Sequence, residues 1–284
     1  MQNYTDNIKY LDSELSFGEI CKPEFYDRLK IDPAHPIYKE TDNFTQEKFK
    51  YPYLPLHLMK YSIPNIENIE TNVLRLLIRD NNENNNIYIP KELLVLKDFI
   101  LENINYHRQH FSFNKNAFIY ITVRQSTYNE LFYKEAFDWH IDGFQGSRIE
   151  RHIVEQNVFW CNKSPTQYLL QPMYCEGLNP SKYDINDFFN KNADEKYLFN
   201  SEENSIYYTN PYNIHKVNSL KFKGKRIFVR LNFSPVEIED PTNTINPMLP
   251  RYYQERKDLR NFLSEYLINE KKHSGFHEKS AEIE

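Results

Sequence analysis

A histidine and an aspartate two residues apart are the first side chains in this sequence whose types could bind a metal. They are His140 and Asp142, in the segment FDWHID at residues 137–142. Successive side chains of an extended strand point to opposite faces, so His140 and Asp142 would share one face, with the apolar residues between them on the other. Two ligands from one strand can then hold the same ion, although so short a motif is weak evidence by itself.

A second histidine and two arginines follow much later in the chain. His215 lies 73 residues beyond Asp142, and Arg226 and Arg230 follow His215 at plus 11 and plus 15. Two histidines and a carboxylate can occupy one face of an octahedral ferrous ion and leave three adjacent positions open. A non-haem oxygenase needs this arrangement to hold a cosubstrate and O2 together. The same ligands could equally suit zinc, so the metal set alone does not decide the chemistry.

The two arginines lie in a segment with strict alternation, RIFVRLNF at residues 226–233. Its odd positions form one continuous apolar face, and its even positions put Arg226 and Arg230 on the other face, about 13 Å apart along an extended strand. A guanidinium group can bind a carboxylate with two parallel hydrogen bonds, so one arginine could hold the far carboxylate of a dicarboxylic acid bound at the metal. Arginines on a solvated strand face are the alternative interpretation.

An HxD pair, a distant histidine and an arginine about ten to fifteen residues later, all on short strands, resemble the Fe(II)/2-oxoglutarate oxygenase superfamily. The two arginines four apart are similar to those of its taurine dioxygenase and phytanoyl-CoA hydroxylase branches. The resemblance covers roughly residues 117 to 235. It implies a double-stranded β-helix, which is a cupin-like jelly roll, with His140, Asp142 and His215 as the catalytic iron ligands.

The same resemblance implies a dioxygenase that uses Fe(II), 2-oxoglutarate and O2. It would release succinate and CO2 and hydroxylate a small-molecule substrate, for example one that bears a carboxylate. Because related halogenases replace the carboxylate ligand with a small residue, Asp142 favours hydroxylation, desaturation or ring closure over halogenation. Arg226 is implied as the partner of the distal carboxylate of 2-oxoglutarate, and Arg230 as the second candidate. Thr166, 24 residues after Asp142, is close to the position of a cosubstrate-binding threonine in the taurine branch.

The elements that must position these residues are mainly short strands. Segments with strand character are expected at residues 117–125, 137–142, 154–161, 166–172, 205–210 and 226–233. Short strands separated by polar or proline-containing segments favour a β-sandwich or a jelly roll over alternating βα units. We expect one catalytic domain over residues 1–272, followed by a flexible tail at 273–284. Its parts are a helical N-terminal part to about residue 110, a β-helix core at about 117–235 and a C-terminal helix at about 250–271.

Two helices are expected in the first half of the chain. One spans residues 65–80, and the other spans residues 91–107 and is opened by Pro90. The first depends on four apolar residues at helical spacing: Ile66, Ile69, Val73 and Leu76. Both helices are expected to cover a sheet. Four further histidines, His107, His110, His273 and His277, are expected at the surface, with no role assigned.

The composition excludes several classes of protein. A net charge of -5 without a Lys/Arg-rich block disfavours a nucleic-acid partner. No apolar run approaches the roughly 20 residues that cross a bilayer, so no membrane association is expected. Three cysteines without CxxC spacing suit a reducing compartment, and we expect a cytoplasmic protein in which the cysteines are small core residues.

Two alternatives to the small-molecule dioxygenase stay open from the sequence. One is an oxygenase that acts on a protein or nucleic acid. The other is a metal-binding jelly roll without redox chemistry, either a zinc hydrolase or a cupin-like binding module. The hydrolase would need a further general base near the metal, and the sequence does not single one out.

Overall fold

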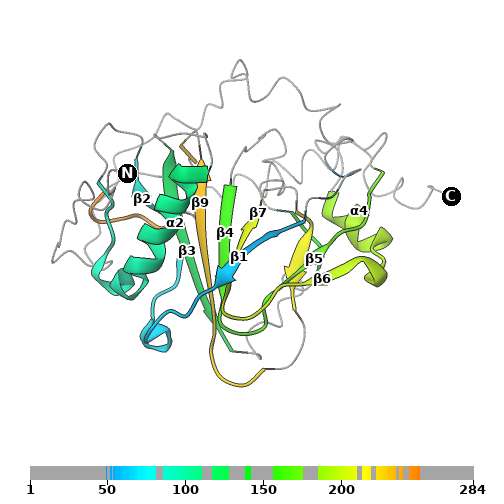
Figure 1. The fold of residues 1–284 in the computed structure, drawn as a ribbon, viewed down its shortest axis with the longest axis horizontal. Helices are drawn as coiled ribbons and strands as arrows, with labels where there is room; N and C mark the ends of the chain where they lie inside the picture. The colour runs from blue at the N-terminus through cyan, green and yellow to red at the C-terminus, as the bar shows by residue number, and fades with distance from the viewer. Residues whose placement is uncertain are drawn as a thin grey trace, which may run out of the picture.

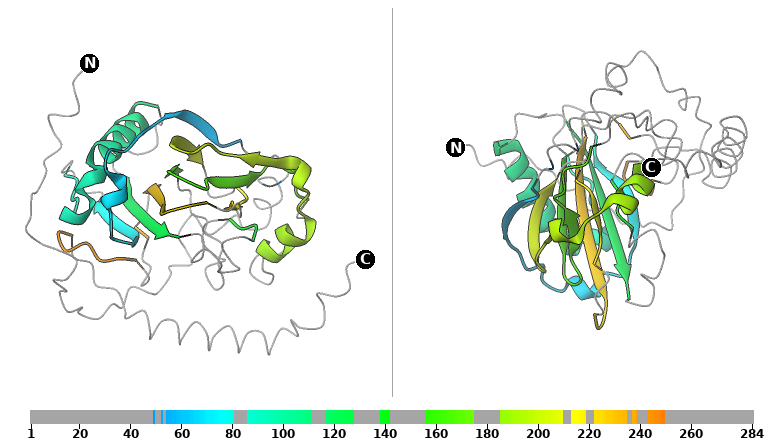
Figure 2. Two further views of the ribbon diagram at one scale, coloured as in Figure 1. Left: turned by 90° about the horizontal axis from the view of Figure 1, so that it is seen from below. Right: turned by 90° about the vertical axis from the view of Figure 1, so that its right-hand side faces the viewer.

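The computed structural model describes residues 49, 52, 54–80, 86–110, 117–127, 138–141, 156–174, 185–209, 213–218, 222–234, 237–238 and 243–249. In these residues the fold is mainly β, with antiparallel sheets and few helices, and is compatible with a β-sandwich (Figures 1 and 2). The strands are β1 (Leu56–Lys60), β2 (Val73–Arg79), β3 (Phe118–Ser126), β4 (Gln156–Cys161), β5 (Thr166–Leu169), β6 (Leu198–Asn200), β7 (Ser205–Thr209), β8 (His215–Val217) and β9 (Arg226–Ser234). The helices are α2 (Lys97–His110) and α4 (Ile185–Asn192), with 3-10 turns η3 (Ile66–Asn68), η4 (Lys91–Leu96) and η7 (Glu195–Tyr197).

The larger sheet has six strands in the order β1-β7-β4-β9-β3-β2, and all its pairs are antiparallel. Near its centre, β9 pairs with β3 in an unbroken register from Phe118 opposite Ser234 to Ser126 opposite Arg226. On its other side β9 pairs with β4, where Phe159 lies opposite Arg230. The strand that carries both candidate arginines is therefore held from both sides.

The smaller sheet has three strands in the order β6-β5-β8, and an isolated bridge between His140 and His215 adds the segment 138–141 beside β8. The order of pairing is nested along the chain. β3 pairs with β9, the segment at His140 pairs with β8, β4 pairs with β7, and β5 pairs with β6. From β3 to β5, and again from β6 to β9, consecutive segments therefore alternate between the two sheets.

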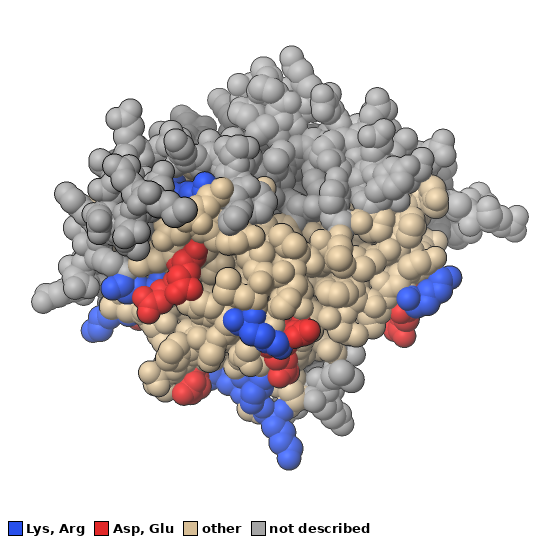
Figure 3. All heavy atoms as spheres, viewed as in Figure 1, with Lys and Arg blue, Asp and Glu red and all other residues tan. Residues whose placement is uncertain are grey.

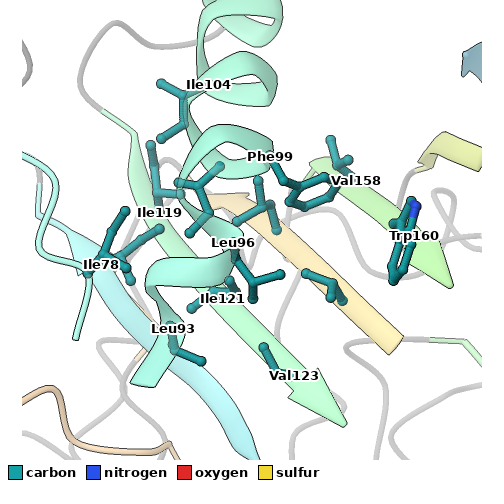
Figure 4. Packing of buried hydrophobic residues seen from close by; sticks show 14 of the residues in the cluster. Ile78, Leu93, Leu96, Phe99, Ile104, Ile119, Ile121, Val123, Val158 and Trp160 are labelled. Atoms are coloured by element: carbon teal, nitrogen blue, oxygen red, sulfur yellow. The ribbon is translucent and has the colours of Figure 1, made fainter. Parts of the chain in front are cut away.

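One face of the six-stranded sheet is covered by η4 and α2. Figure 4 shows Leu93, Leu96, Phe99 and Ile104 of these helices packed on strand residues that include Ile121. The apolar face predicted for β9 is confirmed, because its odd positions belong to this cluster and are at most 1% exposed: Ile227, Val229, Leu231 and Phe233. Each fully buried side chain of this kind contributes about 1.5 to 3 kcal/mol to folding, so this core fixes which face of β9 points away from α2.

The opposite face of the six-stranded sheet meets the smaller sheet. Phe159 of β4 lies with its ring centroid 6.1 Å from that of His215 in β8. Tyr207 of β7 lies 6.2 Å from Phe199 of β6 in the same way, and its hydroxyl accepts a hydrogen bond from Glu202 N at 3.0 Å. The even positions of β9, which carry the arginines, therefore face the space between the two sheets.

The helix predicted at residues 65–80 is wrong. The structure has the single turn η3 and then strand β2. The register of β2 against β3 shifts between Val73 and Leu76, and Arg75 has a positive φ of 43°. This bulge places Val73 and Leu76, three residues apart, opposite Val123 and Ile121, which are only two apart, so a strand acquires the spacing of a helix.

The other expected elements have mixed outcomes. The helix over 91–107 is confirmed, with its first six residues as the 3-10 turn η4. The strands expected at 117–125, 154–161, 166–172, 205–210 and 226–233 correspond to β3, β4, β5, β7 and β9. The short strands β1, β6 and β8 were not anticipated. The C-terminal helix at 250–271 and the tail at 273–284 lie outside the described residues.

His107 is buried at 1% exposure, so the prediction that it lies at the surface is wrong. Its ring stacks on Phe233 at 4.0 Å and 3°, and its Nε2 lies 2.7 Å from Oε1 of Gln156 and donates to it. The apolar face of α2 carries this histidine onto the sheet. Burial lowers the pKa of His107 from 6.5 to about 4. The side chain of His110, and both His273 and His277, lie outside the described residues.

We expect the free energy of unfolding to fall as the pH is lowered from about 6.5 toward 4. In that window the unfolded chain protonates His107 and the folded protein does not, so the stability lost is at most about 3 kcal/mol. A His107→Phe variant keeps an aromatic ring against Phe233. In this variant the free energy of unfolding should no longer fall with pH through protonation of residue 107. Chemical denaturation at several pH values measures both slopes. Equal pH dependence in the two proteins would exclude His107 as the source.

Candidate metal centre

The two histidines predicted as metal ligands lie side by side. His140 N donates to His215 O at 3.0 Å, and His215 N donates to His140 O at 2.9 Å. Their ring centroids are 4.5 Å apart, with the ring planes at 53°. The ring of His215 lies 6.1 Å from Phe159 of the larger sheet and 6.1 Å from Tyr168 of the smaller one. The histidine pair therefore lies between the sheets.

Both imidazoles are oriented by the same local hydrogen bond. Nδ1 of His140 lies 2.8 Å from the carbonyl oxygen of Asp138, and Nδ1 of His215 lies 2.8 Å from that of Asn213. A carbonyl oxygen only accepts, so each Nδ1 carries a proton, and in the neutral imidazole Nε2 is then the nitrogen with the lone pair. A histidine that binds a metal typically donates its other ring N–H in this way, which fixes the tautomer and the ring direction.

The ring separation can be tested against a shared ion. With a metal–nitrogen bond of about 2.1 Å, a further ~1.1 Å to the ring centre and ligands at about 90°, two imidazole centroids lie about 4.5 Å apart. The observed 4.5 Å between His140 and His215 agrees with this value. Asp142, the predicted third ligand, lies outside the described residues, and within those residues no group of three His, Cys, Asp or Glu side chains could hold a metal.

The alternation predicted for the His140 segment is confirmed where the structure describes it. Trp139 and Ile141 are buried in a second apolar cluster, with Phe189 of α4 and Met173, while His140 turns toward β8. This cluster packs the outer side of the segment. The carboxylate expected next on the His140 face is Asp142, which the structure does not describe.

Two asparagines of α4 hold the backbone of the same segment. Asn190 accepts from Trp139 N through Oδ1 at 2.7 Å and donates to Trp139 O through Nδ2 at 2.9 Å. Asn186, one helical turn earlier, accepts from Ile141 N at 3.2 Å. The segment thus pairs with β8 through His140 and with α4 through the residues on either side of His140. Sequence reasoning missed this pair, although its spacing of four residues on one helix face was a usable signal.

Replacing Asn190 should weaken metal binding without removing a ligand. We expect Asn190→Leu to lower the affinity for Fe(II) or Zn(II) about tenfold or more, because the backbone of Trp139, next to His140, loses both of its side-chain hydrogen bonds. Titration of the apoprotein measures the change. Asn192→Ala is the matched control on α4, since that amide only donates to the exposed Phe188 O. Unchanged affinity in Asn190→Leu would show that α4 does not position the histidine.

Arg226 is a buried charge at the start of β9, with 4% of its surface exposed. Its Nε donates to the carbonyl oxygen of Ser164 at 3.0 Å, and its guanidinium lies 5.4 Å from the ring centre of Phe228. Within the described part of the chain its two terminal amino groups make no hydrogen bond, and the ion pairs there, Lys60–Glu202 and Lys196–Asp194, do not include it. Buried charges are normally paired, so Arg226 is suited to an anion from outside the described chain.

The thiol of Cys161 is close to Arg226 but does not neutralise it. Burial raises the pKa of Cys161, and the positive charge of Arg226 only partly opposes this shift. The thiol therefore stays protonated, and it donates to Lys163 O at 2.8 Å. The expectation of a small core cysteine is confirmed for Cys161, while Cys21 and Cys175 lie outside the described residues.

Thr166 and Arg230 occupy two further positions between the sheets. Thr166 is buried and lies opposite Val217, two residues along from the Tyr168–His215 pair, so its side chain shares the face that carries the His215 ring. Arg230 is half-buried and lies opposite Phe159 on the face toward the smaller sheet. The two sheets therefore direct Thr166, Arg226 and Arg230 into the same layer as the histidines.

Three polar residues on this face were missed by sequence reasoning. Asn157, Thr209 and Asn232 are buried on adjacent strands of the larger sheet, on the same side as Phe159. The available signal was the alternation in QNVFWC, which places Asn157 on the same strand face as Phe159.

The surface of the described residues has no dominant sign of charge on the face in Figure 3, where basic and acidic side chains lie close to one another. Among the described residues, no helix is both long and apolar enough to span a bilayer. The sequence matches no protein-family model and no curated protein. The geometry of the site is therefore the basis for assigning a function.

Proposed function

We propose that the protein is an Fe(II)- and 2-oxoglutarate-dependent dioxygenase that oxidises a small molecule. Iron would be held by His140, His215 and Asp142, and 2-oxoglutarate by Arg226. When bound, ferrous iron and 2-oxoglutarate activate O2, so that the keto acid is decarboxylated to succinate and CO2 while the substrate is oxidised.

The order of strand pairing supports a jelly roll for the core. Eight successive segments from β3 to β9 pair first with eighth, second with seventh, third with sixth and fourth with fifth. Nested antiparallel pairing of this kind is expected of a jelly roll, with β1 and β2 added at the two edges of its larger sheet. In such a fold the second and seventh strands bring distant residues together, as the bridge between His140 and His215 does here.

The donor set fits a catalytic metal better than two packed core histidines. In His140 and His215 each Nδ1 donates to a backbone carbonyl oxygen, as the ring nitrogen that does not bind the metal typically does in a metal-binding histidine. Two neutral imidazoles and one carboxylate are suited to ferrous iron and leave positions open for a chelating cosubstrate. A zinc hydrolase could use the same three residues, so the choice depends on what else faces the site.

The observation that carries the proposal is the buried Arg226, which has no acidic partner in the described chain. A hydrolase or a simple binding module would not need a buried guanidinium on the strand face that points into the space between the sheets, where the histidines lie. A dicarboxylic cosubstrate does, because one carboxylate can chelate the metal while the other forms paired hydrogen bonds with Arg226. Thr166, on the facing sheet, offers a hydroxyl within that layer.

The experiment is an anaerobic titration followed by turnover. Adding 2-oxoglutarate to the Fe(II) protein should produce the visible charge-transfer band of a chelated keto acid, and admitting O2 should then yield succinate. The Zn(II) protein is the control and should give neither signal. Tight Zn(II) binding with no band and no succinate from the Fe(II) protein would instead favour the non-redox metal protein.

A further inference from the structure

The inner face of the larger sheet carries a buried polar row, defined here as Asn232 of β9, Asn157 of β4 and Thr209 of β7. Asn157 lies directly opposite both of the others in the strand register. Directly opposed residues of antiparallel strands point to the same face, so the three side chains form one line across three strands. They are 1%, 1% and 5% exposed in the order given.

The hydrogen bonds within the polar row do not use all of the polar atoms of its three side chains. Asn232 Nδ2 donates to Asn157 Oδ1 at 2.8 Å, and the buried amide nitrogen of Asn157 has no hydrogen-bond partner among the described residues. The hydroxyl of Thr209 is also buried, and no group in the described part of the chain forms a hydrogen bond with it. Native proteins pair the large majority of such groups, and leaving one unpaired is costly, so two adjacent ones point to a group that binds there.

The position of the row relates it to the candidate metal centre. On β9 the inward residues run from Arg226 through Phe228 and Arg230 to Asn232, about 20 Å along the strand. Phe159 lies opposite Arg230, and its ring faces His215 at 6.1 Å. The histidines are therefore level with the third of these four positions, with Arg226 on one side and the polar row on the other.

The histidines separate Arg226 from the polar row, so the cosubstrate and the substrate can bind on opposite sides of the metal. If 2-oxoglutarate extends from the metal toward Arg226, as the proposed function requires, it runs away from Asn157. We propose that the polar row binds an uncharged oxygen of the substrate, either a hydroxyl or an amide carbonyl, and so selects substrates that carry such a group.

The chemistry of the row gives the class of ligand. The amide of Asn157 can only donate at its free nitrogen, and the hydroxyl of Thr209 can donate or accept. Their shared complement is an oxygen with lone pairs. None of the three side chains is charged, so a carboxylate placed here would be desolvated without a cation in the row, whereas a neutral oxygen is not penalised in this way.

The test compares two probes of nearly identical shape, pentanamide and pentanoate, on the full-length chain. Calorimetric titration of the Fe(II)·2-oxoglutarate protein, kept anaerobic, is expected to give a dissociation constant about tenfold lower for pentanamide. Asn157→Leu and Thr209→Val should each remove that preference while changing the affinity for 2-oxoglutarate less than about twofold. Ser205→Ala is the matched control, since this buried β7 hydroxyl already donates to Glu203 O.

A stability measurement shows whether the variants report on the row or on misfolding. Because the hydroxyl of Thr209 has no hydrogen-bond partner within the described ranges, Thr209→Val should unfold at the same or a higher temperature than the wild type in the absence of probes. A lower melting temperature, no preference for pentanamide at any soluble concentration, or equal loss of 2-oxoglutarate binding in Asn157→Leu would each overturn the proposal. Titration of the metal-free protein separates the two inferences, because a preference that persists there supports the row even if no Fe(II)·2-oxoglutarate complex forms.

Discussion

Replacing His215 with alanine is expected to lower Fe(II) affinity about a hundredfold or more and to abolish the charge-transfer band of the Fe(II)·2-oxoglutarate complex. The residue contributes one of two imidazoles whose Nδ1 atoms donate to backbone carbonyl oxygens, so Nε2 is the ring nitrogen proposed to bind the metal. Loss of a direct ligand should cost at least as much as the ten- to hundredfold typical of residues that only orient ligands. His140→Ala should behave in the same way, because both rings are proposed to share one ion.

The measurement is an anaerobic titration of the apoprotein with Fe(II), followed by addition of 2-oxoglutarate. His57→Ala is the control, since His57 is exposed on the edge strand β1, with its ring 5.1 Å from that of Tyr207, and is not one of the candidate ligands. It should leave the affinity unchanged. A band of wild-type intensity in His215→Ala would remove this residue from the metal site and with it the proposed activity.

Replacing Arg226 should separate cosubstrate binding from metal binding. We expect Arg226→Met to raise the dissociation constant of 2-oxoglutarate about 30-fold or more, as truncating one partner of a buried charged pair typically does. Fe(II) affinity should stay within about twofold of the wild type, because the guanidinium is not a metal ligand.

Although Arg226→Met should weaken cosubstrate binding, we expect it not to destabilise the fold. In the absence of ligand, Arg226→Met should be as stable as the wild type or more stable, since it replaces a buried guanidinium, whose only described hydrogen bond is to Ser164 O, with an apolar chain of similar length. Thermal unfolding of the apoprotein measures this. A variant that loses stability, iron and 2-oxoglutarate binding together would show that Arg226 supports the fold instead. Arg226→Lys should bind the cosubstrate with intermediate affinity, since it keeps the charge and loses the fork of two donors.

The strands could be predicted from the sequence where alternation was regular. β9 is the clearest case, because its odd residues form an uninterrupted apolar face that packs under α2. β2 could not be predicted, because the bulge at Arg75 gives its apolar residues the spacing of a helix. His107 was misplaced for a related reason, since a single polar residue on the buried face of α2 looks like a surface residue until the partner that satisfies it, Gln156, is seen.

The sequence by itself determined which residue types could make a metal site and which face of each strand they would share. Local alternation fixes His140 opposite its apolar neighbours, and Arg226 opposite the apolar face of β9. Only the tertiary structure decided that His140 and His215 pair, because their bridge depends on the order of strands in the smaller sheet. It also decided that Arg226 is buried and that the Asn157 amide nitrogen and the Thr209 hydroxyl have no partner among the residues described, because burial and hydrogen bonding depend on segments that are distant in the chain.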